Sequence, residues 1–210
     1  MDAKIIYEGR EVTFFDVDEK SHIGNCLLNV CWYELKNLEV IRSLDVQGNY
    51  VDAGAHIGTH ALFFSLFCPA KRVYAFESKH EYYLKLLKNI NGNHVKNCLP
   101  FNYALVGERG EQMNPDEGET FKTETLDHFN LENVKLLKID VENMELRVLK
   151  GAVRTLKTVE HLFLEVWTDE VYAKRGETSP MAEIVSFLQP YGIRPVRELE
   201  WENLWHFKRM

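Results

Sequence analysis

The chain alternates between short apolar runs and longer segments in which apolar residues recur at helical spacing. The apolar runs predict five buried strands, at residues 49–53, 72–76, 99–105, 134–139 and 162–167. The segments with helical spacing predict helices at residues 58–67, 79–91, 143–157 and 180–189. Because strands that alternate with such helices form βαβ units, the sequence predicts an α/β fold with a mostly parallel sheet.

The N-terminal part of the chain departs from this alternation. Residues 1–31 contain two strand-like pieces, around Lys4–Tyr7 and Val12–Phe15, and are predicted to form a strand-rich extension. A helix with apolar residues three positions apart follows, at Leu35, Leu38, Ile41 and Leu44. The extension and the main domain, residues 32–210, are expected to form one compact unit.

The C-terminal part departs from the alternation in another way. Strands are predicted near residues 193–198 and 204–208, and no helix separates them. They are therefore expected to form an antiparallel pair at the edge of the sheet, joined around Glu200–Asn203. A Gly- and Glu-rich excursion is predicted at residues 106–120.

Composition narrows the class of protein. The 210 residues are 45% hydrophobic, enough to bury the core of one domain, and their formal net charge is −7. The acidic balance argues against a nucleic-acid partner, whose affinity comes mainly from clustered lysine and arginine. The longest apolar run, residues 61–68, is too short for a membrane span. The four cysteines lie in apolar runs and form no C-x-x-C pair, which predicts reduced thiols and a cytoplasmic location.

The run YVDAGAHIG, from Tyr50 to Gly58, predicts a strand, a glycine loop and the start of a helix. This is the layout of a nucleotide-type ligand site, in which Gly54 and Gly58 let the backbone approach the ligand. Asp52 would repel a pyrophosphate but suits a cation such as S-adenosylmethionine, which carries a sulfonium and an ammonium. The alternative interpretation is structural: the glycines make a tight turn and Asp52 caps the helix.

The ends of the next two strands carry residues suited to the rest of that cofactor. Glu77 ends the second strand of the parallel sheet and is expected to accept hydrogen bonds from the ribose hydroxyls. Ser78 follows as a further cofactor residue, although a capping box with Glu81 also explains it. Asn102 and Ala104, near the end of the third strand, are expected to face the adenine.

A second dense group of ionisable residues follows the strand at 134–139. Asp140 ends that strand between Lys138 and Glu142, an arrangement typical of a site whose ionisation is controlled. We expect Asp140 to act as a general base or a metal ligand and to contact the cofactor, with Glu142 and Glu165 as its catalytic neighbours. Such oxygen ligands suit Mg²⁺ or Mn²⁺, but clustered carboxylates also bind ribose and ammonium groups.

Several motifs, in the same order along the chain, resemble the FkbM family of S-adenosylmethionine-dependent methyltransferases. They are YVDAGAHIG at 50–58, VYAFES at 73–78, TLDHF at 125–129, KIDVENME at 138–145 and LKGA at 149–152. The resemblance covers residues 32–167 and implies the class I methyltransferase (Rossmann-like) fold. That fold is a three-layer sandwich, with a mostly parallel seven-stranded sheet that ends in an antiparallel C-terminal hairpin. The resemblance also implies O-methylation of a hydroxyl on a sugar or a natural product.

Two residues depart from the family's pattern. His56 stands where the family usually has asparagine, which puts a titratable group beside the methionine end of the cofactor. We therefore expect His56 to contact the cofactor and consider it as a second candidate base. Asn143 replaces the glycine usual after Asp-Val-Glu and is expected to narrow the approach to Asp140. By the same resemblance, Trp32-Tyr33-Glu34 covers the cofactor.

The sequence thus predicts an S-adenosylmethionine-dependent O-methyltransferase that acts on a hydroxyl of a sugar or glycan. The acceptor is expected to lie between three segments, at 106–120, 167–172 and 174–177. Two alternatives keep the cofactor: a methyltransferase with a non-sugar small-molecule acceptor and a non-catalytic cofactor-binding scaffold. A nicotinamide dehydrogenase is a third alternative and would need a full G-x-G-x-x-G loop. A nucleic-acid methyltransferase is a fourth and would need a track of basic residues. The chain is interpreted as a whole protein or as one domain of a larger glycan-modifying enzyme.

Overall fold

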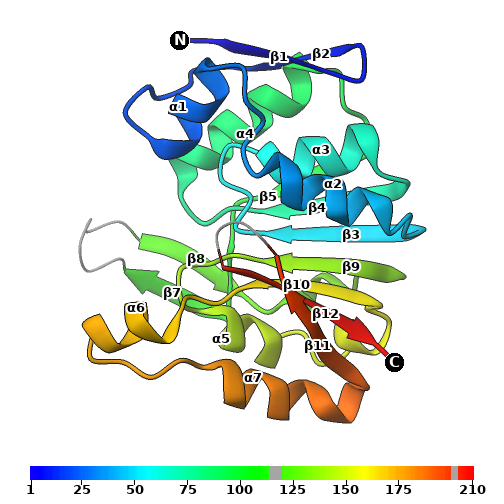
Figure 1. Ribbon diagram of the computed structural model, residues 1–210, viewed down its shortest axis with the longest axis vertical. Helices are drawn as coiled ribbons and strands as arrows, with labels where there is room; N and C mark the ends of the chain where they lie inside the picture. The colour runs from blue at the N-terminus through cyan, green and yellow to red at the C-terminus, as the bar shows by residue number, and fades with distance from the viewer. Residues whose placement is uncertain (114–119, 200–202) are drawn as a thin grey trace.

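The computed structural model describes residues 1–113, 120–199 and 203–210. Its centre is a seven-stranded sheet with helices on both faces, which makes three layers (Figure 1). The strands of this sheet are β3 (Gly48–Ala53), β4 (Ala70–Phe76), β5 (Cys98–Phe101), β9 (Val134–Ile139), β10 (His161–Glu165), β11 (Ile193–Glu198) and β12 (Leu204–Arg209). The helices are α1 (His22–Leu28), α2 (Leu35–Ser43), α3 (Thr59–Phe67), α4 (His80–Gly92), α5 (Glu145–Lys150), α6 (Asp169–Lys174) and α7 (Met181–Leu188). Across the described residues, none of these helices has the length and apolar character needed to cross a membrane.

The order of the strands in the sheet is β11-β12-β10-β9-β3-β4-β5. The pairs from β10 to β5 are parallel, whereas β12 runs antiparallel to both β10 and β11. The predicted parallel sheet with an antiparallel C-terminal pair is therefore confirmed. The predicted connection at 200–203 lies outside the described residues except for Asn203, and part of the excursion at 106–120 also lies outside them.

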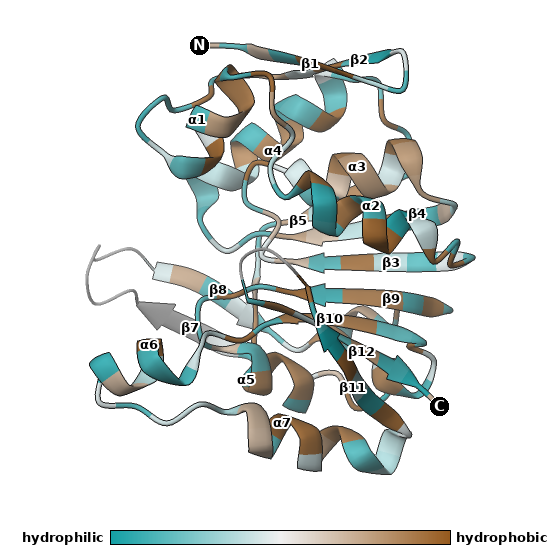
Figure 2. Ribbon diagram, in the orientation of Figure 1, coloured by the Kyte–Doolittle hydropathy of each residue, from teal (hydrophilic) through white to brown (hydrophobic). Residues whose placement is uncertain are grey.

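Alternate residues of the central strands belong to two separate hydrophobic cores, because successive side chains of a strand point to opposite faces. In β3, Tyr50 packs in the core that contains residues of α2, α3 and α4. The next residue, Val51, packs in the core that contains residues of α5 and α7. Figure 2 shows the result, with apolar residues concentrated along the central strands and on the helices that cover them. Two filled cores hold the sheet rigid and fix its carboxyl edge.

Residues 1–31 pack onto the layer of helices formed by α3 and α4. β1 (Ala3–Tyr7) and β2 (Arg10–Phe14) form an antiparallel hairpin. Val12 and Phe14 are completely buried, in the same core as Trp32 and Phe63. Helix α1 follows the hairpin and was not predicted, because seven residues are too few to show a helical period.

The predicted strand over 99–105 is in fact two strands. β5 ends at Phe101, whereas β6 (Ala104–Leu105) belongs to a separate three-stranded sheet with β8 (Thr120–Glu124) and β7 (Gly110–Met113). Between them, the Asn102 side-chain amide donates to the carbonyls of Glu77 and Ser78 at 2.8 and 3.0 Å. These side-chain hydrogen bonds take the place of the main-chain bonds of the sheet just after β5, and the chain leaves the large sheet there.

The predicted helix over 143–157 is shorter than expected. α5 ends at Lys150, and only a short 3₁₀ turn, Thr155–Lys157, follows. Gly151 lies at the end of α5, where an added Cβ would be 2.2 Å from the carbonyl oxygen of Val106. Close packing of Gly151 against Val106, which is distant in sequence, thus determines where the helix ends.

Candidate functional site

The glycine loop joins β3 to α3 at the carboxyl edge of the sheet, where main-chain hydrogen bonds hold it. The N–H groups of Gly54 and Ala55 donate to the Phe76 carbonyl at 3.0 and 2.9 Å. Gly54 and Gly58 have φ values of 84° and 94°, and a Cβ on Gly54 would lie 1.7 Å from the Asp140 carbonyl oxygen. Both glycines are therefore required by the backbone conformation, and Gly54 also by the close approach of β9.

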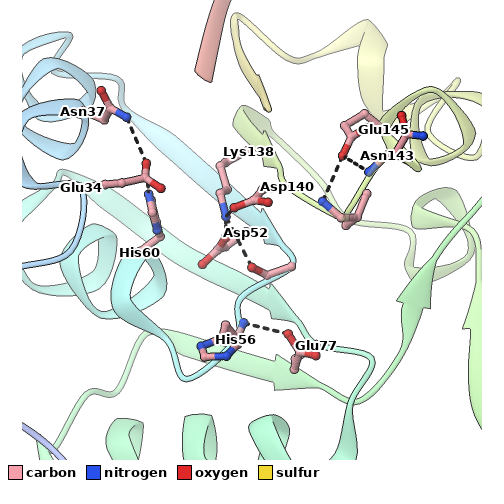
Figure 3. A network of polar contacts seen from close by, with 12 residues as sticks. Glu34, Asn37, Asp52, His56, His60, Glu77, Lys138, Asp140, Asn143 and Glu145 are labelled. Atoms are coloured by element: carbon pink, nitrogen blue, oxygen red, sulfur yellow. Dashed lines mark hydrogen bonds and ion pairs between the residues drawn. The ribbon is translucent and has the colours of Figure 1, made fainter. Parts of the chain in front are cut away.

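Asp52 and Lys138 are directly opposed on β3 and β9 and form a buried ion pair (Figure 3). Lys138 Nζ lies 3.4 Å from Asp52 Oδ1 and 3.1 Å from Asp140 Oδ2. Burial favours a neutral lysine, but the carboxylates of Asp140 and Asp52 keep the pKa of Lys138 above its usual value. The alternative role for Asp52 is wrong, since Gly58 is the N-cap residue of α3 and no side chain caps it. Within the described part of the chain, neither Asp52 oxygen has a hydrogen-bond partner, and the contact of Oδ1 with Lys138 is an ion pair.

Asp140 directly follows β9, and Glu165 is the last residue of the neighbouring strand β10. The Asp140 side chain is 32% exposed, so it reaches the surface of the carboxyl edge. Burial opposes its ionisation, but Lys138 holds the pKa of Asp140 below its usual value. Burial and the adjacent Asp140 carboxylate raise the pKa of Glu165 to about 9. At neutral pH this pair therefore holds one proton, on Glu165, and Asp140 is ionised.

Glu142, on the turn after β9, and Glu145, the first residue of α5, have different surroundings. Glu145 is buried, and its Oε1 accepts hydrogen bonds from the N–H groups of Val141 and Asn143, both at 3.2 Å. Burial raises the pKa of Glu145 to about 7. Glu142 is exposed and has a φ of 55°. Glu145 thus fixes the turn, while Glu142 lies on its outer side.

The metal site considered from the sequence is not assembled. Among residues 1–113, 120–199 and 203–210, no three His, Cys, Asp or Glu side chains are grouped so that they could hold a metal ion. Asp140, Glu142 and Glu165 therefore do not form a carboxylate set for Mg²⁺ or Mn²⁺. The positive charge beside Asp140 is the ammonium of Lys138.

Glu77 directly follows β4, where the sequence predicts ribose recognition, and its carboxylate also supports the backbone. Oε2 accepts from the His56 N–H and Oε1 from the Lys79 N–H, both at 2.8 Å. Burial raises the pKa of Glu77, and these two donors oppose the increase. The predicted capping box of Ser78 and Glu81 is wrong, because Lys79 is the N-cap residue of α4 and no side chain caps the helix. The Ser78 hydroxyl also donates to Oε1 at 3.5 Å, whereas Oε2 retains a second lone pair that can accept from a ligand hydroxyl.

A cavity of about 650 Å³ lies at the ends of β4 and β5, beside the residues predicted to face adenine. Ser78, Tyr83, Asn102 and Tyr103 are among the residues that line it. Its volume lies within the range of about 300–1,000 Å³ that is typical of small-molecule sites. Ala104 is the first residue of β6, where it pairs with Thr123.

His56 lies in the middle of the glycine loop with a φ of 49°, and its ring centroid is 3.9 Å from that of Tyr82. Burial and the nearby Lys138 charge lower the pKa of His56 to about 4. Its Nδ1 is buried without a hydrogen-bond partner in the described chain. His56 is therefore neutral at pH 7, a weak base there, and better suited to contact a ligand.

A second buried pair joins the segment before α2 to α3, and sequence reasoning did not predict it. Glu34 Oε2 lies 3.4 Å from His60 Nε2 and accepts from Asn37 Nδ2 at 3.0 Å (Figure 3). Nearby, Trp32 Nε1 donates to the Thr59 carbonyl at 3.2 Å. The available signals were weak: an acid in an aromatic segment and a histidine early in an apolar helix.

A mostly parallel seven-stranded sheet with an antiparallel C-terminal pair, and helices on both faces, defines a class I methyltransferase fold. The sequence model of the methyltransferase FkbM domain matches residues 52–195. The chain therefore belongs to the FkbM methyltransferase family, as its motifs predict.

Individual relatives agree with this assignment. Hexuronic acid methyltransferase AglP of Haloferax volcanii is 27% identical over 134 residues, which cover 55% of this chain and 54% of that protein. A methyltransferase FkbM from Methylobacillus flagellatus has a TM-score of 0.58 at 16% identity and covers 78% of this chain and 44% of its own. A putative methyltransferase from Streptococcus mutans, solved in complex with SAH, has a TM-score of 0.56 at 15% identity and covers 85% of this chain and 98% of its own. The chain spans about half the length of the curated relative.

Proposed function

We propose that this chain is an S-adenosylmethionine-dependent methyltransferase that methylates the oxygen of a sugar hydroxyl. Membership of the FkbM family supports methyl transfer, and the structural relative in complex with SAH supports the cofactor. The relative named hexuronic acid methyltransferase supports a sugar acceptor. The chemistry of the carboxyl edge supports the same reaction.

The charges at this edge support a cationic cofactor. Asp52 and Asp140 face the same lysine ammonium, and the two buried oxygens of Asp52 have no hydrogen-bond partner in the described chain, so an ammonium or sulfonium is favoured nearby. We expect residues 54–58 to hold the methionine part, Glu77 to hold the ribose hydroxyls, and the cavity beside Asn102 to hold the adenine. When bound, the cofactor supplies an electrophilic methyl group.

The observation that carries the proposal is geometric: the partly exposed Asp140 carboxylate lies 3.1 Å from the buried Lys138 ammonium at the carboxyl edge. A sugar hydroxyl is only weakly acidic and must lose its proton as its oxygen bonds to the methyl carbon. Asp140 accepts this proton, because Lys138 keeps it ionised at neutral pH and because its side chain reaches the surface. Glu165 stays protonated and so adds no second negative charge. Holding the hydroxyl in line with the methyl group supplies much of the remaining acceleration.

Two alternatives lead to different outcomes for the same carboxylate. A domain that only binds the cofactor would transfer no methyl group, and Asp140→Asn would leave its function intact. A methyltransferase with a non-sugar acceptor would modify phenols or simple alcohols and leave sugars unmodified. The panel of acceptors and the Asp140→Asn variant therefore distinguish the proposed function from these two alternatives.

The test is incubation with methyl-labelled S-adenosylmethionine and a panel of neutral sugars, uronic acids, non-sugar alcohols and RNA. The proposal expects the label in a sugar O-methyl group, and loss of that label with Asp140→Asn while cofactor binding remains. Transfer to none of the sugars contradicts the sugar acceptor. Transfer to RNA contradicts the expectation, based on the acidic composition, that nucleic acid is not the substrate.

A further inference from the structure

Asn89 of α4 and the C-cap residue of this helix, Asn93, lie one turn apart and bind the end of the same N-terminal hairpin. Asn89 Oδ1 accepts from the Phe15 N–H at 2.7 Å. Asn93 Oδ1 accepts from the Thr13 N–H at 2.8 Å, and its Nδ2 donates to the Thr13 carbonyl at 2.7 Å. Asn89 also has a second partner, because its Nδ2 donates to the carbonyl of Ile57 at 2.8 Å. The fully buried Asn89 thus joins the hairpin to the glycine loop.

The loop depends on outside contacts for its conformation. His56 and Gly58 both have left-handed φ values, 49° and 94°, and a histidine adopts such a value only when its surroundings impose it. On one side, the N–H of His56 is fixed by the Glu77 carboxylate at 2.8 Å. On the other side, the bond from Asn89 to the Ile57 carbonyl attaches the loop to α4.

The hairpin packs closely against α4 at this point. A Cβ on Gly92 would lie 2.1 Å from the ring of Phe15, so the ring rests directly on the helix backbone. Lys88 pairs with Asp16 at 2.6 Å and lies over the Phe15 ring at 5.4 Å from its centroid. Asn89 therefore accepts its hydrogen bond from a docked segment, and its side-chain amide connects that segment to the loop.

We infer that Asn89 is a positioning residue, which couples docking of the N-terminal hairpin to the ligand-binding conformation of residues 56–58. The inference rests on the proposed function, in which this loop holds the methionine part of S-adenosylmethionine. One buried amide satisfies a donor in Phe15 and an acceptor in Ile57, so it orients both segments at once. A loop that is already ordered loses less freedom on binding, so cofactor affinity depends on Asn89.

Asn93→Ala is the matched control for Asn89→Ala. Asn89→Ala loses one bond to the hairpin and Asn93→Ala loses two, and both variants are expected to lower the melting temperature, but only Asn89→Ala frees the Ile57 carbonyl. Titration calorimetry with S-adenosylmethionine is expected to show about tenfold weaker binding for Asn89→Ala, in the range of typical coupling between sites, and less than about twofold for Asn93→Ala. Equal losses of affinity in the two variants would overturn the inference.

A second variant and a measurement on the wild-type chain keep the inference testable if Asn89→Ala folds poorly. Asn89→Asp keeps an acceptor for the Phe15 N–H but sets an oxygen against the Ile57 carbonyl, and it is expected to weaken binding at least as much as Asn89→Ala. In the wild-type chain, residue-resolved hydrogen exchange is expected to slow more at the Phe15 N–H than at the Thr13 N–H when the cofactor is added, because coupling is reciprocal. Equal slowing at the two positions contradicts the coupling through Asn89.

The wild-type titration separates this inference from the proposed function. If the wild-type chain does not bind S-adenosylmethionine, the proposed function fails. Exchange of residues 56–58 in the cofactor-free variants still decides whether Asn89 holds the loop: faster exchange in Asn89→Ala than in Asn93→Ala supports it, and equal exchange refutes it. If the wild-type chain binds and the two variants bind alike, the function stands and the inference fails.

Discussion

The ammonium of Lys138 lies 3.1 Å from a carboxylate oxygen of Asp140, inside the edge where the central strands end. The same ammonium lies 3.4 Å from Asp52, so one buried cation links the ends of β3 and β9. This lysine also keeps the pKa of Asp140 below its usual value, against the effect of burial. The stability of the edge and the proposed role of Asp140 as a base therefore depend on one side chain.

Replacing Lys138 is expected to be costly for the fold. Lys138→Met leaves the buried Asp52 without its counter-ion, and breaking a buried pair in this way typically lowers the unfolding free energy by about 3–5 kcal/mol. The control is Lys150→Met, whose pair with Glu183 at 3.0 Å is exposed on both sides, and which should cost less than about 1 kcal/mol. Urea unfolding measures both. Similar small losses of unfolding free energy in the two variants would mean that the buried ion pair of Lys138 contributes little to stability.

Replacing Asp140 is expected to separate catalysis from binding. Asp140→Asn keeps the shape of the side chain but cannot accept the proton, so turnover should fall by about 100-fold or more, the usual contribution of a general base. Affinity for S-adenosylmethionine should remain within a few-fold of the wild-type value. Glu160→Gln is the control, because Glu160 pairs with Lys135 at 2.6 Å on the surface beside the amino ends of the strands. Unchanged turnover in Asp140→Asn would assign the proton transfer to another group.

Glu165 should make the stability of the fold depend on pH. Its pKa is raised from 4.5 to about 9, so between these values the folded chain holds a proton that the unfolded chain has lost. The stabilisation is complete below the unfolded pKa and is lost as the pH rises toward 9, by at most about 1.4 kcal/mol per pH unit. Glu165→Gln removes this dependence, and its unfolding free energy in urea should fall less steeply between these pH values than that of the wild type. Parallel curves for the two proteins would show that Glu165 is ionised at neutral pH.

His56→Asn tests whether the histidine is a base. Its pKa of about 4 predicts a neutral ring at pH 7, and asparagine tolerates the left-handed φ of 49° at this position. The variant should retain most of its turnover and lose about 0.5–1.5 kcal/mol of stability with the contact to Tyr82. Steady-state kinetics and urea unfolding measure these effects. A decrease in turnover like that of Asp140→Asn would instead identify His56 as a proton acceptor.

The central fold was predictable because its signals are local. Apolar runs and helical periods mark the parallel strands and their crossovers, and the missing helix between β11 and β12 marks the antiparallel pair. Helix α1 has only seven residues and shows no clear period. The early end of α5 depends on Gly151 packing against the distant Val106, a contact that no local pattern contains.

The positions of the site residues were predictable, but their partners were not. Asp52, Glu77 and Asp140 follow from the rule that parallel strands end at one edge. The opposition of Asp52 to Lys138 depends on the register between β3 and β9. The capping box predicted at Ser78 is wrong because the N-cap residue of α4 is Lys79, one position later. The bond from Asn89 to the glycine loop depends on how α4 docks, which sequence reasoning did not address.

In the proposed mechanism, the carboxyl edge binds S-adenosylmethionine and transfers its methyl group to a sugar hydroxyl, with Asp140 as the base. The most direct test is mass spectrometry of sugars and uronic acids after incubation with the cofactor, for the wild-type chain and Asp140→Asn at saturating cofactor. This mechanism predicts an O-methylated sugar with the wild type and at least about 100-fold less product with the variant. Equal product from both proteins, or a wild-type chain that binds the cofactor and methylates no sugar, would contradict it.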